Sequence, residues 1–454
     1  MGIDSEFLNI LTDKAGENRV YTGGDINPSY GKDEAAFAEP SMPDAVVEAN
    51  SAGMVSDVLK LCRSYRVPVT VRGAGTGKAG GCVAAEWGVL LSLRDMNAIL
   101  GVDEAARTMR VQPGALLQDV KAEAERHGLR YPPDPGEKTA TIGGNASTNA
   151  SGPCALKYGA TRDYVLDAEI VLAGGNTVRL SERPEYAEVI GSEGTLGVIT
   201  ELTLRLTDKP GCEAILLLPF AGAEECVSAA AAILAAGFEP AALEFLDTAL
   251  VEYSGSVTGS AVFPVSLDGE RVAATLMLTL EGADEDAVME QMEALAERAE
   301  ELGCLDILVG DTPNMMRDFR AAYDAFHTSV ESAASSCEAN VSLPPEEVWT
   351  YMEYARAEGA KRGIAPMFCA HLGSGGVHTF AVSDKPLAEF APAAGEYMSA
   401  LYEKCASLGG DPAGEYGVGR VKGAYLSAER RAAHAALKAE LDPEGILNPG
   451  KAAE

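Results

Sequence analysis

VTVRGAGTGKAGG, residues 69–81, is a glycine-rich segment that begins in a mostly apolar run. Residues 67–71 are apolar and predict a strand, and the glycines after them permit positive φ and close approach of the backbone to a phosphate. Residues 75–80 satisfy G-x-G-x-x-G, the pattern of dinucleotide-binding turns, but that pattern requires a helix directly after the turn. Residues 88–93 (GVLLSL) predict another strand instead. We therefore expect a phosphate-binding loop between strands, with a flexible hairpin loop as the alternative.

Strands and helices alternate on both sides of this loop. The other strands expected from apolar runs or alternation are residues 44–50, 108–111, 167–172, 177–180 and 198–206. The helices expected from apolar spacing or composition are residues 54–65, 116–127, 223–236, 284–302 and 427–440. The pattern of strands and helices is interrupted at residues 207–211. The different order of strands and helices after this break predicts a second α+β domain.

The charge of the chain is strongly acidic. Its 454 residues include 36 Lys and Arg against 68 Asp and Glu, a formal net charge of −32. This balance disfavours sequence-independent binding of nucleic acid and docking on anionic membranes, because both need clustered cations. No apolar segment reaches the roughly 18 residues of a membrane-spanning helix. We expect the surplus acid on outer faces such as the helix at 284–300.

Cysteine usage and the N-terminus bear on the compartment. Nine cysteines are scattered without a C-x-x-C pair, which argues against a disulfide framework, an iron–sulfur cluster or a zinc ribbon. The first residues include early acids and no basic region, so no secretory signal is expected. These features predict a reduced, cytoplasmic protein with mostly packed thiols.

Four further segments are unusual in combination. They are YPPDPGEKTATIGG (131–144), NASTNASGPCALKYG (145–159), GSEGTLGVIT (191–200) and DPEGILNPGK (442–451). With residues 69–81, in this order and spacing, they resemble the FAD-linked oxidases of the vanillyl-alcohol oxidase / p-cresol methylhydroxylase superfamily. This family includes the glycolate oxidase large subunit, D-lactate dehydrogenase and D-2-hydroxyglutarate dehydrogenase.

The resemblance covers roughly residues 40–451 and implies an α+β fold. Residues 1–210 would form the FAD-binding domain, with subdomains at about 40–100 and 101–210. Residues 211–425 would form an α+β substrate or cap domain with a central antiparallel sheet. Residues 426–454 would return to the FAD domain.

The resemblance also implies FAD as cofactor. His127 is the only histidine before residue 210 and lies at an expected helix end, so we expect FAD to be non-covalent. An isolated Ser or Thr among the matching residues has a turn or cap as its alternative role. The expected cofactor-binding residues are Arg72, Gly73, Ala74, Gly75, Thr76, Gly77, Gly80, Gly81, Pro135, Gly136, Thr141, Gly143, Gly144, Ser147, Asn149, Gly152, Glu193, Gly194, Gly197, Ile199 and Asn448.

Two short motifs concern the substrate side. HLGSGGVH (371–378) and GEYG (414–417) resemble the family's H-x-G-D-G-N-x-H and G-E-H-G motifs. In metal-dependent members both histidines and the Glu bind a divalent metal, which assigns His371, His378 and Glu415 to Zn²⁺ or Mn²⁺. Such a ligand set leaves positions open for a substrate carboxylate and hydroxyl. Two packed histidines around a glycine turn are the alternative.

The motifs depart from the family at three positions. Ser374 and Gly376 replace an Asp and an Asn, and Tyr416 replaces the family's catalytic His. A Tyr has a reference pKa of about 10 and is a weak base at neutral pH. Three outcomes stay open: Tyr416 acts as a phenolate beside a metal, the metal alone acidifies the hydroxyl, or His327 supplies the base.

A candidate substrate-binding arginine lies in MRDFRAAYDAFHTSVE, residues 316–331. This segment resembles the family helix whose Arg binds the substrate carboxylate, and Arg320 is the matching residue. Arginine suits the role because its guanidinium forms two parallel hydrogen bonds with a carboxylate. A surface ion pair is the alternative. The expected catalytic residues are thus Tyr416, His371, His378 and Arg320.

The implied activity is oxidation of a D-2-hydroxy acid, such as D-lactate, glycolate or a D-2-hydroxyglutarate-like acid, to the 2-oxo acid. Hydride would pass to flavin N5, and electrons would leave to an electron-transfer flavoprotein, an iron–sulfur subunit, quinone or oxygen. The alternatives are an alcohol or aromatic oxidase, a transferase like alkyl-glycerone-phosphate synthase, or a non-catalytic flavin subunit. The oligomeric state stays open, a homodimer included.

Overall fold

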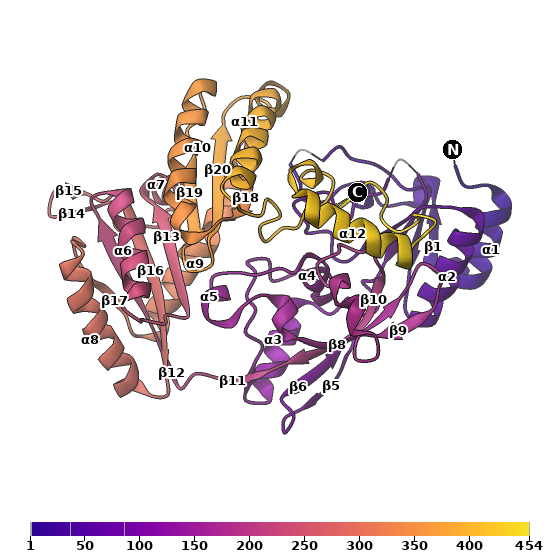
Figure 1. Ribbon diagram of the computed structural model, residues 1–454, viewed down its shortest axis with the longest axis horizontal. Helices are drawn as coiled ribbons and strands as arrows, with labels where there is room; N and C mark the ends of the chain where they lie inside the picture. Colours follow the sequence, from indigo (N-terminus) through magenta and orange to yellow (C-terminus); the bar gives the residue numbers. More distant parts are fainter. Residues whose placement is uncertain (1, 37, 86, 454) are drawn as a thin grey trace. The chain divides into compact units, whose positions relative to one another are not determined.

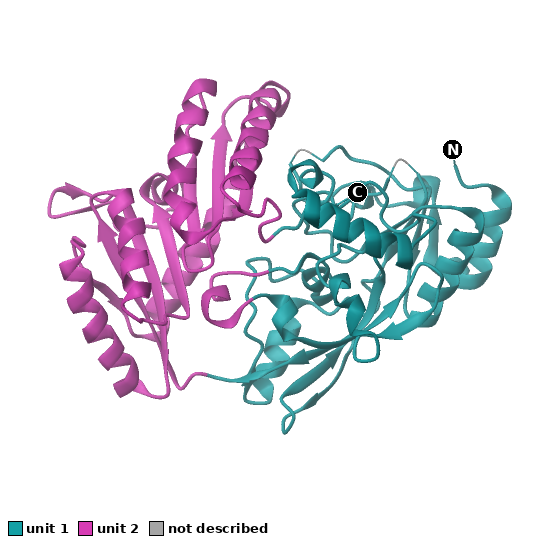
Figure 2. Cartoon of the chain, viewed as in Figure 1, with its two compact units in different colours: residues 1–150, 160–209, 416–454 teal, residues 151–159, 210–415 magenta. Residues whose placement is uncertain are grey.

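The computed structural model describes residues 2–36, 38–85 and 87–453. The chain forms two compact units (Figure 2). Unit 1 comprises residues 1–150, 160–209 and 416–454, and unit 2 comprises residues 151–159 and 210–415. The expected domain ranges differ from these units in two places. Residues 151–159 belong to unit 2, and the chain returns to unit 1 at Tyr416 and not at residue 426.

Unit 1 contains a small, mostly parallel sheet beside the glycine-rich loop. Its strand order is β1 (Val20–Thr22), β2 (Ala45–Glu48), β4 (Val89–Ser92) and β3 (Val69–Arg72). Helices α1 (Ser5–Ala15) and α2 (Ala52–Tyr65) accompany this sheet. Ser51 caps α2, and the four apolar positions that predicted the helix are fully buried, namely Val55, Val58, Leu59 and Cys62.

A second, antiparallel sheet completes unit 1. Its strand order is β5 (Ile99–Asp103), β6 (Thr108–Val111), β10 (Val198–Arg205), β8 (Val165–Val171) and β9 (Thr177–Arg179). The strands expected at residues 167–172 and 177–180 are confirmed as β8 and β9, which pair as an antiparallel hairpin. The other elements of unit 1 are α3 (Leu117–Arg126), β7 (Leu129–Arg130) paired with β11 (Thr207–Asp208), α4 (Ile142–Thr148) and α12 (Ala428–Leu441).

Unit 2 is built on one seven-stranded sheet in which every pairing is antiparallel (Figure 1). The strand order is β17 (Leu308–Gly310), β12 (Cys212–Phe220), β16 (Ala274–Gly282), β13 (Ala242–Asp247), β19 (Met367–His371), β20 (Gly376–Ser383) and β18 (Ser335–Ser342). The α+β fold expected from the sequence, with a central antiparallel sheet after residue 211, is confirmed.

Helices accompany this sheet, and one of them matters for the site. They are α5 (Ala155–Tyr158), α6 (Ala223–Ala235), α7 (Thr248–Thr258), α8 (Glu285–Glu301), α9 (Pro313–Glu331), α10 (Val348–Arg362) and α11 (Leu387–Ser407); β14 (Ser266–Leu267) and β15 (Glu270–Arg271) form a separate hairpin. The buried side of α9, with Phe319, Tyr323 and Phe326, packs in one core with Cys369 of β19 and Phe380 of β20. That packing fixes α9 over the strands that carry His371 and His378.

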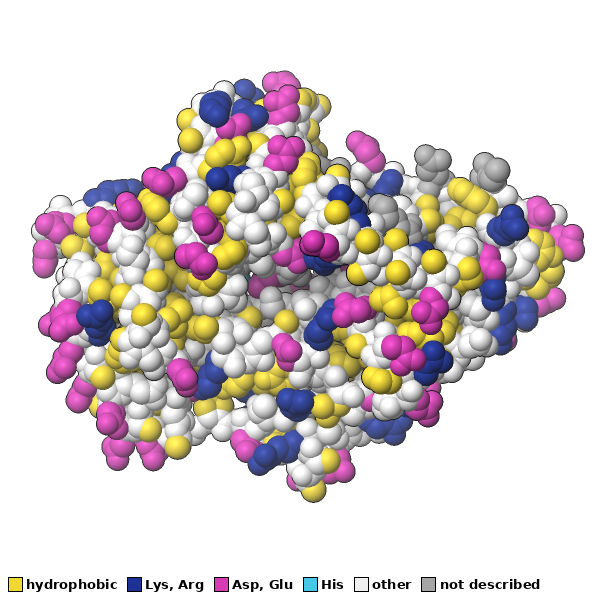
Figure 3. Space-filling view, in the orientation of Figure 1, with side chains coloured by type: hydrophobic (Ala, Val, Ile, Leu, Met, Phe, Trp, Pro, Cys, Tyr) yellow, Lys and Arg dark blue, Asp and Glu magenta, His cyan; other side chains and the backbone are white. Residues whose placement is uncertain are grey.

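The surface of unit 2 explains part of the acidic charge. Helix α8 buries Val288, Met292, Leu295 and Ala299 and exposes its acidic side chains, as expected. Figure 3 shows acidic side chains gathered over α8. Six of the nine cysteines are buried, so the thiols are mostly packed. Among the described residues, no helix is long and apolar enough to cross a membrane.

The C-terminal segment is held in unit 1 by two buried side chains. Asn448 adopts φ +43° and accepts from the Val71 N–H at 2.9 Å, and its amide donates to the Glu193 carbonyl. The Glu193 carboxylate accepts from the N–H groups of Val418 at 2.6 Å and Gly419 at 2.9 Å. Both residues were expected to contact FAD, but their polar side-chain atoms are used to join chain segments.

Replacing Asn448 with Ala therefore tests how the C-terminal segment is anchored. Asn448→Ala leaves two buried backbone groups without partners, so we expect the free energy of unfolding to fall by about 2–5 kcal/mol. Asn18→Ala, at an exposed position, is the control and should stay within about 0.5 kcal/mol. Denaturant unfolding of unit 1 measures both. Equal stability of the two variants would contradict the anchoring role.

Candidate cofactor and metal sites

The glycine-rich loop of unit 1 has the features of an anion cradle. Among the described residues, no helix follows β3 before α3, so the expected absence of a Rossmann helix is confirmed. Gly75 has φ +89°, a conformation that favours glycine. Within the described chain, no group accepts from the backbone N–H of Ala74, Gly75 or Thr76. Three successive amides without an acceptor fit a pyrophosphate.

Arg72 has a different position from the one expected of a phosphate ligand. Its guanidinium donates to the carbonyls of Lys32 at 2.9 Å and Ser29 at 3.1 Å, and it lies over the ring of Tyr30 at 5.7 Å. A Cβ at Gly75 would collide with this guanidinium. Arg72 thus supports the loop from within, and the cradle consists of backbone amides.

Several expected cofactor segments do meet in unit 1. A Cβ at Gly73 would touch Thr141, whose hydroxyl caps α4 by accepting from Gly144 N–H. A Cβ at Gly81 would lie 2.8 Å from the Glu193 carboxylate, and the Glu193 N–H donates to the Ser147 carbonyl at 2.8 Å. The loop at 73–81, helix α4 and residues 191–194 therefore surround one region. This convergence fits the expected FAD site.

Some of the other expected cofactor-binding residues make contacts that serve the fold. Gly197 and Ile199 lie in the second sheet of unit 1, where a Cβ at Gly197 would contact Ile170. Asn149 ends α4 at φ +54° and accepts from the Arg162 N–H. Gly152 belongs to unit 2. For the other expected residues, the described part of the chain gives no further contact that would identify an FAD-binding role. They are Ala74, Thr76, Gly77, Gly80, Pro135, Gly136, Gly143 and Gly194, and their roles remain predictions.

The two motif histidines meet on one face of the unit 2 sheet because of strand register. His371 of β19 lies opposite Gly376 of β20, and His378 lies opposite Cys369, two residues before His371. Side chains opposite one another or offset by two share a face. A Cβ at Gly376 would lie only 3.1 Å from the His371 ring, so glycine there leaves room for the imidazole.

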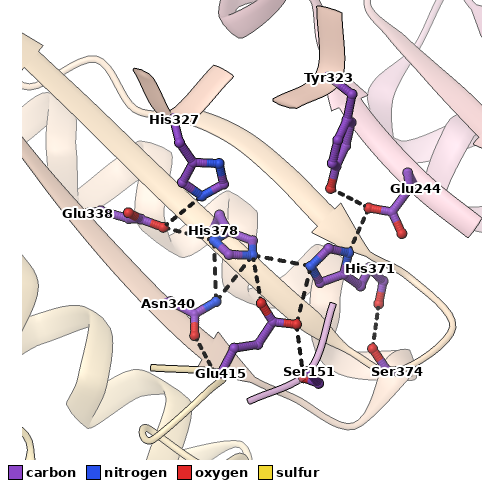
Figure 4. Close-up of polar contacts among 10 residues, drawn as sticks. All are labelled: Ser151, Glu244, Tyr323, His327, Glu338, Asn340, His371, Ser374, His378 and Glu415. Atoms are coloured by element: carbon purple, nitrogen blue, oxygen red, sulfur yellow. Dashed lines mark hydrogen bonds and ion pairs between the residues drawn. The ribbon is translucent and has the colours of Figure 1, made fainter. Parts of the chain in front are cut away.

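Glu415 closes a triangle with these imidazoles (Figure 4). The two Nε2 atoms lie 3.3 Å apart, and the Glu415 oxygens lie 3.3 Å from His371 Nε2 and 3.6 Å from His378 Nε2. Tetrahedral bonds of about 2.0–2.1 Å place neighbouring ligand atoms about 3.3–3.4 Å apart. All three side chains are at most 11 % exposed. The donor set therefore fits Zn²⁺ in both chemistry and size.

The position of Glu415 depends on two neighbours. Its N–H donates to the Asn340 side-chain oxygen at 2.6 Å, and the Ser151 hydroxyl donates to its carboxylate at 3.0 Å. Asn340 is the strand partner of His378, so the same residue orients both ligands. Neither residue was predicted: Asn340 lies outside every quoted segment, and Ser151 lies within residues 145–159 but was not singled out.

Two further carboxylates stand behind the histidines. Glu244 accepts from His371 Nδ1 at 2.6 Å, and Glu338 lies 2.8 Å from His378 Nδ1. Neither residue was predicted to belong to the site. A signal was present for Glu244, because it interrupts the apolar run ALEFLD at 242–247 and is fully buried there.

The electrostatics of this cluster are strongly coupled. Burial alone lowers the pKa of His371 and His378, but nearby carboxylates outweigh it and raise both pKa values above the usual range. Glu244 and Glu415 act on His371, while Glu338 and Glu415 act on His378. Burial raises the pKa of Glu415, and the imidazoles reverse this and hold it well below its usual value.

Arg320 does not join this cluster. Its guanidinium pairs with Glu213 at 2.7 Å, and its side chain is 48 % exposed. Seven residues separate it from His327, about 10 Å along the helix axis. The structure thus shows the surface ion pair that was the alternative. His327 does reach the cluster, where its Nε2 lies 3.4 Å from Glu338 and its ring is 5.1 Å from that of His378.

Tyr416 begins the last segment of unit 1, directly after Glu415. The ammonium groups of Lys78 and Lys422 lie 5.6 Å and 6.0 Å from the centre of its ring. Positive charge at such distances favours a developing negative charge on the phenol oxygen. The surroundings of Tyr416 are therefore compatible with a base, and its role remains a prediction.

Two family models match most of the chain. A model of the FAD binding domain matches residues 43–181, and a model of the C-terminal domain of FAD linked oxidases matches residues 209–452. The chain is 36 % identical to a D-lactate dehydrogenase of Anaerostipes hadrus over 95 % of this chain and 94 % of that protein. It is 32 % identical to glycolate oxidase subunit GlcD of Bacillus subtilis over 97 % and 93 % of the two chains.

Solved structures share the fold at lower identity. A p-cresol methylhydroxylase with bound substrate matches with a TM-score of 0.82 and 17 % identity over 100 % of this chain and 98 % of that one. An alkyldihydroxyacetonephosphate synthase matches with a TM-score of 0.78 and 20 % identity over 98 % and 85 %. These likenesses establish the architecture alone.

Replacing Gly75 with Ala tests the cradle. The added methyl would displace the Arg72 guanidinium and force a left-handed conformation, so we expect FAD affinity to fall at least about tenfold. Gly237→Ala has the same conformational strain, with φ +90° and open space around the Cβ, and should keep its affinity. Recovery of flavin fluorescence on dilution measures FAD release. Equal affinity in both variants would exclude the loop from the cofactor site.

The cluster also predicts how pH affects metal binding. Because the pKa values of His371 and His378 are raised in the folded protein, protonation of these imidazoles stabilises the metal-free fold below about pH 6.5. This stabilisation is lost as the pH rises above the pKa values of the two imidazoles in the folded protein. Zn²⁺ requires neutral imidazoles. Added Zn²⁺ should therefore raise Tm more at about pH 8 than at about pH 6. His371→Ala should abolish the increase in Tm caused by Zn²⁺. An increase in Tm that becomes smaller as the pH rises would refute the assignment of these residues as metal ligands.

Proposed function

Because the chain belongs to the family of FAD-linked oxidases, we propose that it oxidises a short D-2-hydroxy acid to the 2-oxo acid. The relatives named D-lactate dehydrogenase and glycolate oxidase subunit support this substrate class. Lactate and glycolate are both 2-hydroxy monocarboxylates. A D-2-hydroxyglutarate-like acid is the longer alternative.

The triangle of His371, His378 and Glu415 carries the proposal. Two imidazole nitrogens and one carboxylate form an open ligand set, which leaves positions for the hydroxyl and carboxylate of a 2-hydroxy acid. A divalent metal held there would act as a Lewis acid on the substrate hydroxyl. The protein's part is to orient both imidazoles through the strand register, to fix Glu415 through Asn340 and Ser151, and to limit the exposure of the set to solvent.

The flavin side of the proposal rests on unit 1. When bound, FAD accepts a hydride at N5. The loop at 73–81 would bind the pyrophosphate through its backbone amides, and α4 with residues 191–194 would complete the surroundings. We propose that the bound FAD is dissociable and that electrons then leave to an external acceptor.

The proton of the substrate hydroxyl needs an acceptor, and Tyr416 is the candidate. It follows the ligand Glu415 in the chain, and Lys78 and Lys422 flank its ring. His327 is less suited, because it faces Glu338 on the Nδ1 side of His378. A transferase or an aromatic oxidase shares the fold, but the paired histidines with Glu415 favour a hydroxy acid.

Anaerobic reduction of the flavin tests the function. D-lactate or glycolate should bleach the visible flavin band, and the L-enantiomer of lactate should not. Tyr416→Phe should bind FAD normally and slow the bleaching about a hundredfold or more, the contribution of a general base. Tyr65→Phe, at an exposed helix position, is the matched control.

Two results would count against the proposal. Absence of bleaching by D-lactate, glycolate and D-2-hydroxyglutarate, with and without added Zn²⁺ or Mn²⁺, would reject the substrate class. Full activity of Tyr416→Phe would reject the phenol as base and leave the substrate class intact.

A further inference from the structure

We propose that Glu244 and Glu338 are positioning residues, one behind each ligand histidine, that hold both imidazoles with the proton on Nδ1 and the lone pair on Nε2. This inference rests on the metal centre of the proposed function. It concerns two residues that lie outside the motifs at 371–378 and 414–417. Its basis is the arrangement of four neighbouring strands, β13, β19, β20 and β18.

The strand order produces a symmetrical support. The inner strands β19 and β20 carry His371 and His378, and the flanking strands β13 and β18 carry Glu244 and Glu338. Glu244 is the direct strand partner of His371, and Glu338 lies two residues from Asn340, the partner of His378. Figure 4 shows Glu415 between the imidazoles and the two other carboxylates on their outer sides.

The contact of Glu244 with His371 determines which nitrogen carries the proton. The carboxylate lies 2.6 Å from Nδ1, and neither side chain is more than 4 % exposed. A carboxylate only accepts hydrogen bonds, so Nδ1 must donate, and whenever the imidazole is neutral its lone pair is therefore on Nε2. That lone pair is then available on the side of Glu415 and His378. This arrangement raises the basicity of a ligand histidine.

Tyr323 of α9 fixes Glu244 in turn. Its hydroxyl donates to the same Glu244 oxygen at 2.6 Å in a buried contact. The second oxygen of Glu244 has no hydrogen-bond partner among the described residues. A buried carboxylate with one unpartnered oxygen does not favour folding. Its place in an apolar strand is explained by the orientation it gives His371.

Glu338 has the same relation to His378, although its neighbours allow a second reading. His327, Glu338 and His378 bring three ligand atoms within 4.8 Å of one another, a spacing at which a cation could also bind. The contact of Glu338 with Nδ1 is 2.8 Å, a hydrogen-bond length and shorter than the roughly 3.3 Å between two ligands of one tetrahedral Zn²⁺. We therefore assign Glu338 as an acceptor and not as a ligand.

Zinc affinity of the FAD-loaded protein tests this inference. Glu244→Gln and Glu338→Gln should each weaken Zn²⁺ binding tenfold to a hundredfold, as measured by competition with a chromophoric chelator. Glu213→Gln, a carboxylate of the same sheet that pairs with exposed Arg320, is the matched control and should bind as the wild type. Every form should bind one Zn²⁺ per chain at saturation.

A spectroscopic readout separates orientation from folding. The visible bands of Co²⁺ bound in place of Zn²⁺ should shift in Glu244→Gln and remain unchanged in Glu213→Gln. A circular dichroism spectrum like that of the wild type shows that unit 2 of a variant is folded, and retained FAD shows the same for unit 1. If Glu244→Gln loses its fold, Tyr323→Phe removes only the supporting hydroxyl and should still weaken Zn²⁺ binding severalfold.

Different failures have different meanings. Zn²⁺ affinities within twofold of the wild type in both Gln variants would overturn the positioning role while leaving the metal centre standing. Two Zn²⁺ per wild-type chain, with one lost in Glu338→Gln, would make Glu338 a ligand and overturn its assignment. A wild type that binds no Zn²⁺ would remove the metal centre and this inference together, while flavin reduction by a hydroxy acid would decide the function separately.

Discussion

The charge of three carboxylates of low solvent exposure around two imidazoles is the constraint on which the site in unit 2 depends. With neutral imidazoles, Glu244, Glu338 and Glu415 give a formal charge of −3 in a site of low solvent exposure. Burying unbalanced charge is costly, so protons or a cation must compensate. Two protons or one divalent cation each reduce the sum to −1. The raised imidazole pKa values are the response of the metal-free protein to this demand.

In unit 1, the expected ligand is an anion, and the groups that would bind it are backbone amides and not charged side chains. The chain is strongly acidic, yet its glycine-rich loop offers backbone amides, and the guanidinium of Arg72 donates to the carbonyls of Ser29 and Lys32. Backbone dipoles attract a pyrophosphate locally without changing the net charge. The surplus acid lies on exposed faces such as α8, where solvent screens it. Within one acidic chain, unit 1 thus has an amide-rich loop that suits an anion, and unit 2 has a carboxylate-rich cluster that suits a cation.

Motif and periodicity predicted a large part of this. The buried face of α2, the hairpin of β8 and β9, and the meeting of His371, His378 and Glu415 all follow from local spacing or from the family resemblance. Other features depend on strand order, which the sequence does not display. Glu244 lies 127 residues before His371 and is joined to it only by the pairing of β13 with β19. Arg320 meets Glu213, 107 residues away, because helix α9 packs against strand β12.

The X-ray absorption spectrum of the Zn²⁺-loaded protein shows directly whether His371, His378 and Glu415 bind the metal. We expect two imidazole ligands and carboxylate or other oxygen ligands at about 2.0–2.1 Å, with no sulfur bound to the metal. A sulfur ligand at about 2.3 Å, or a spectrum without imidazole scattering, would contradict it.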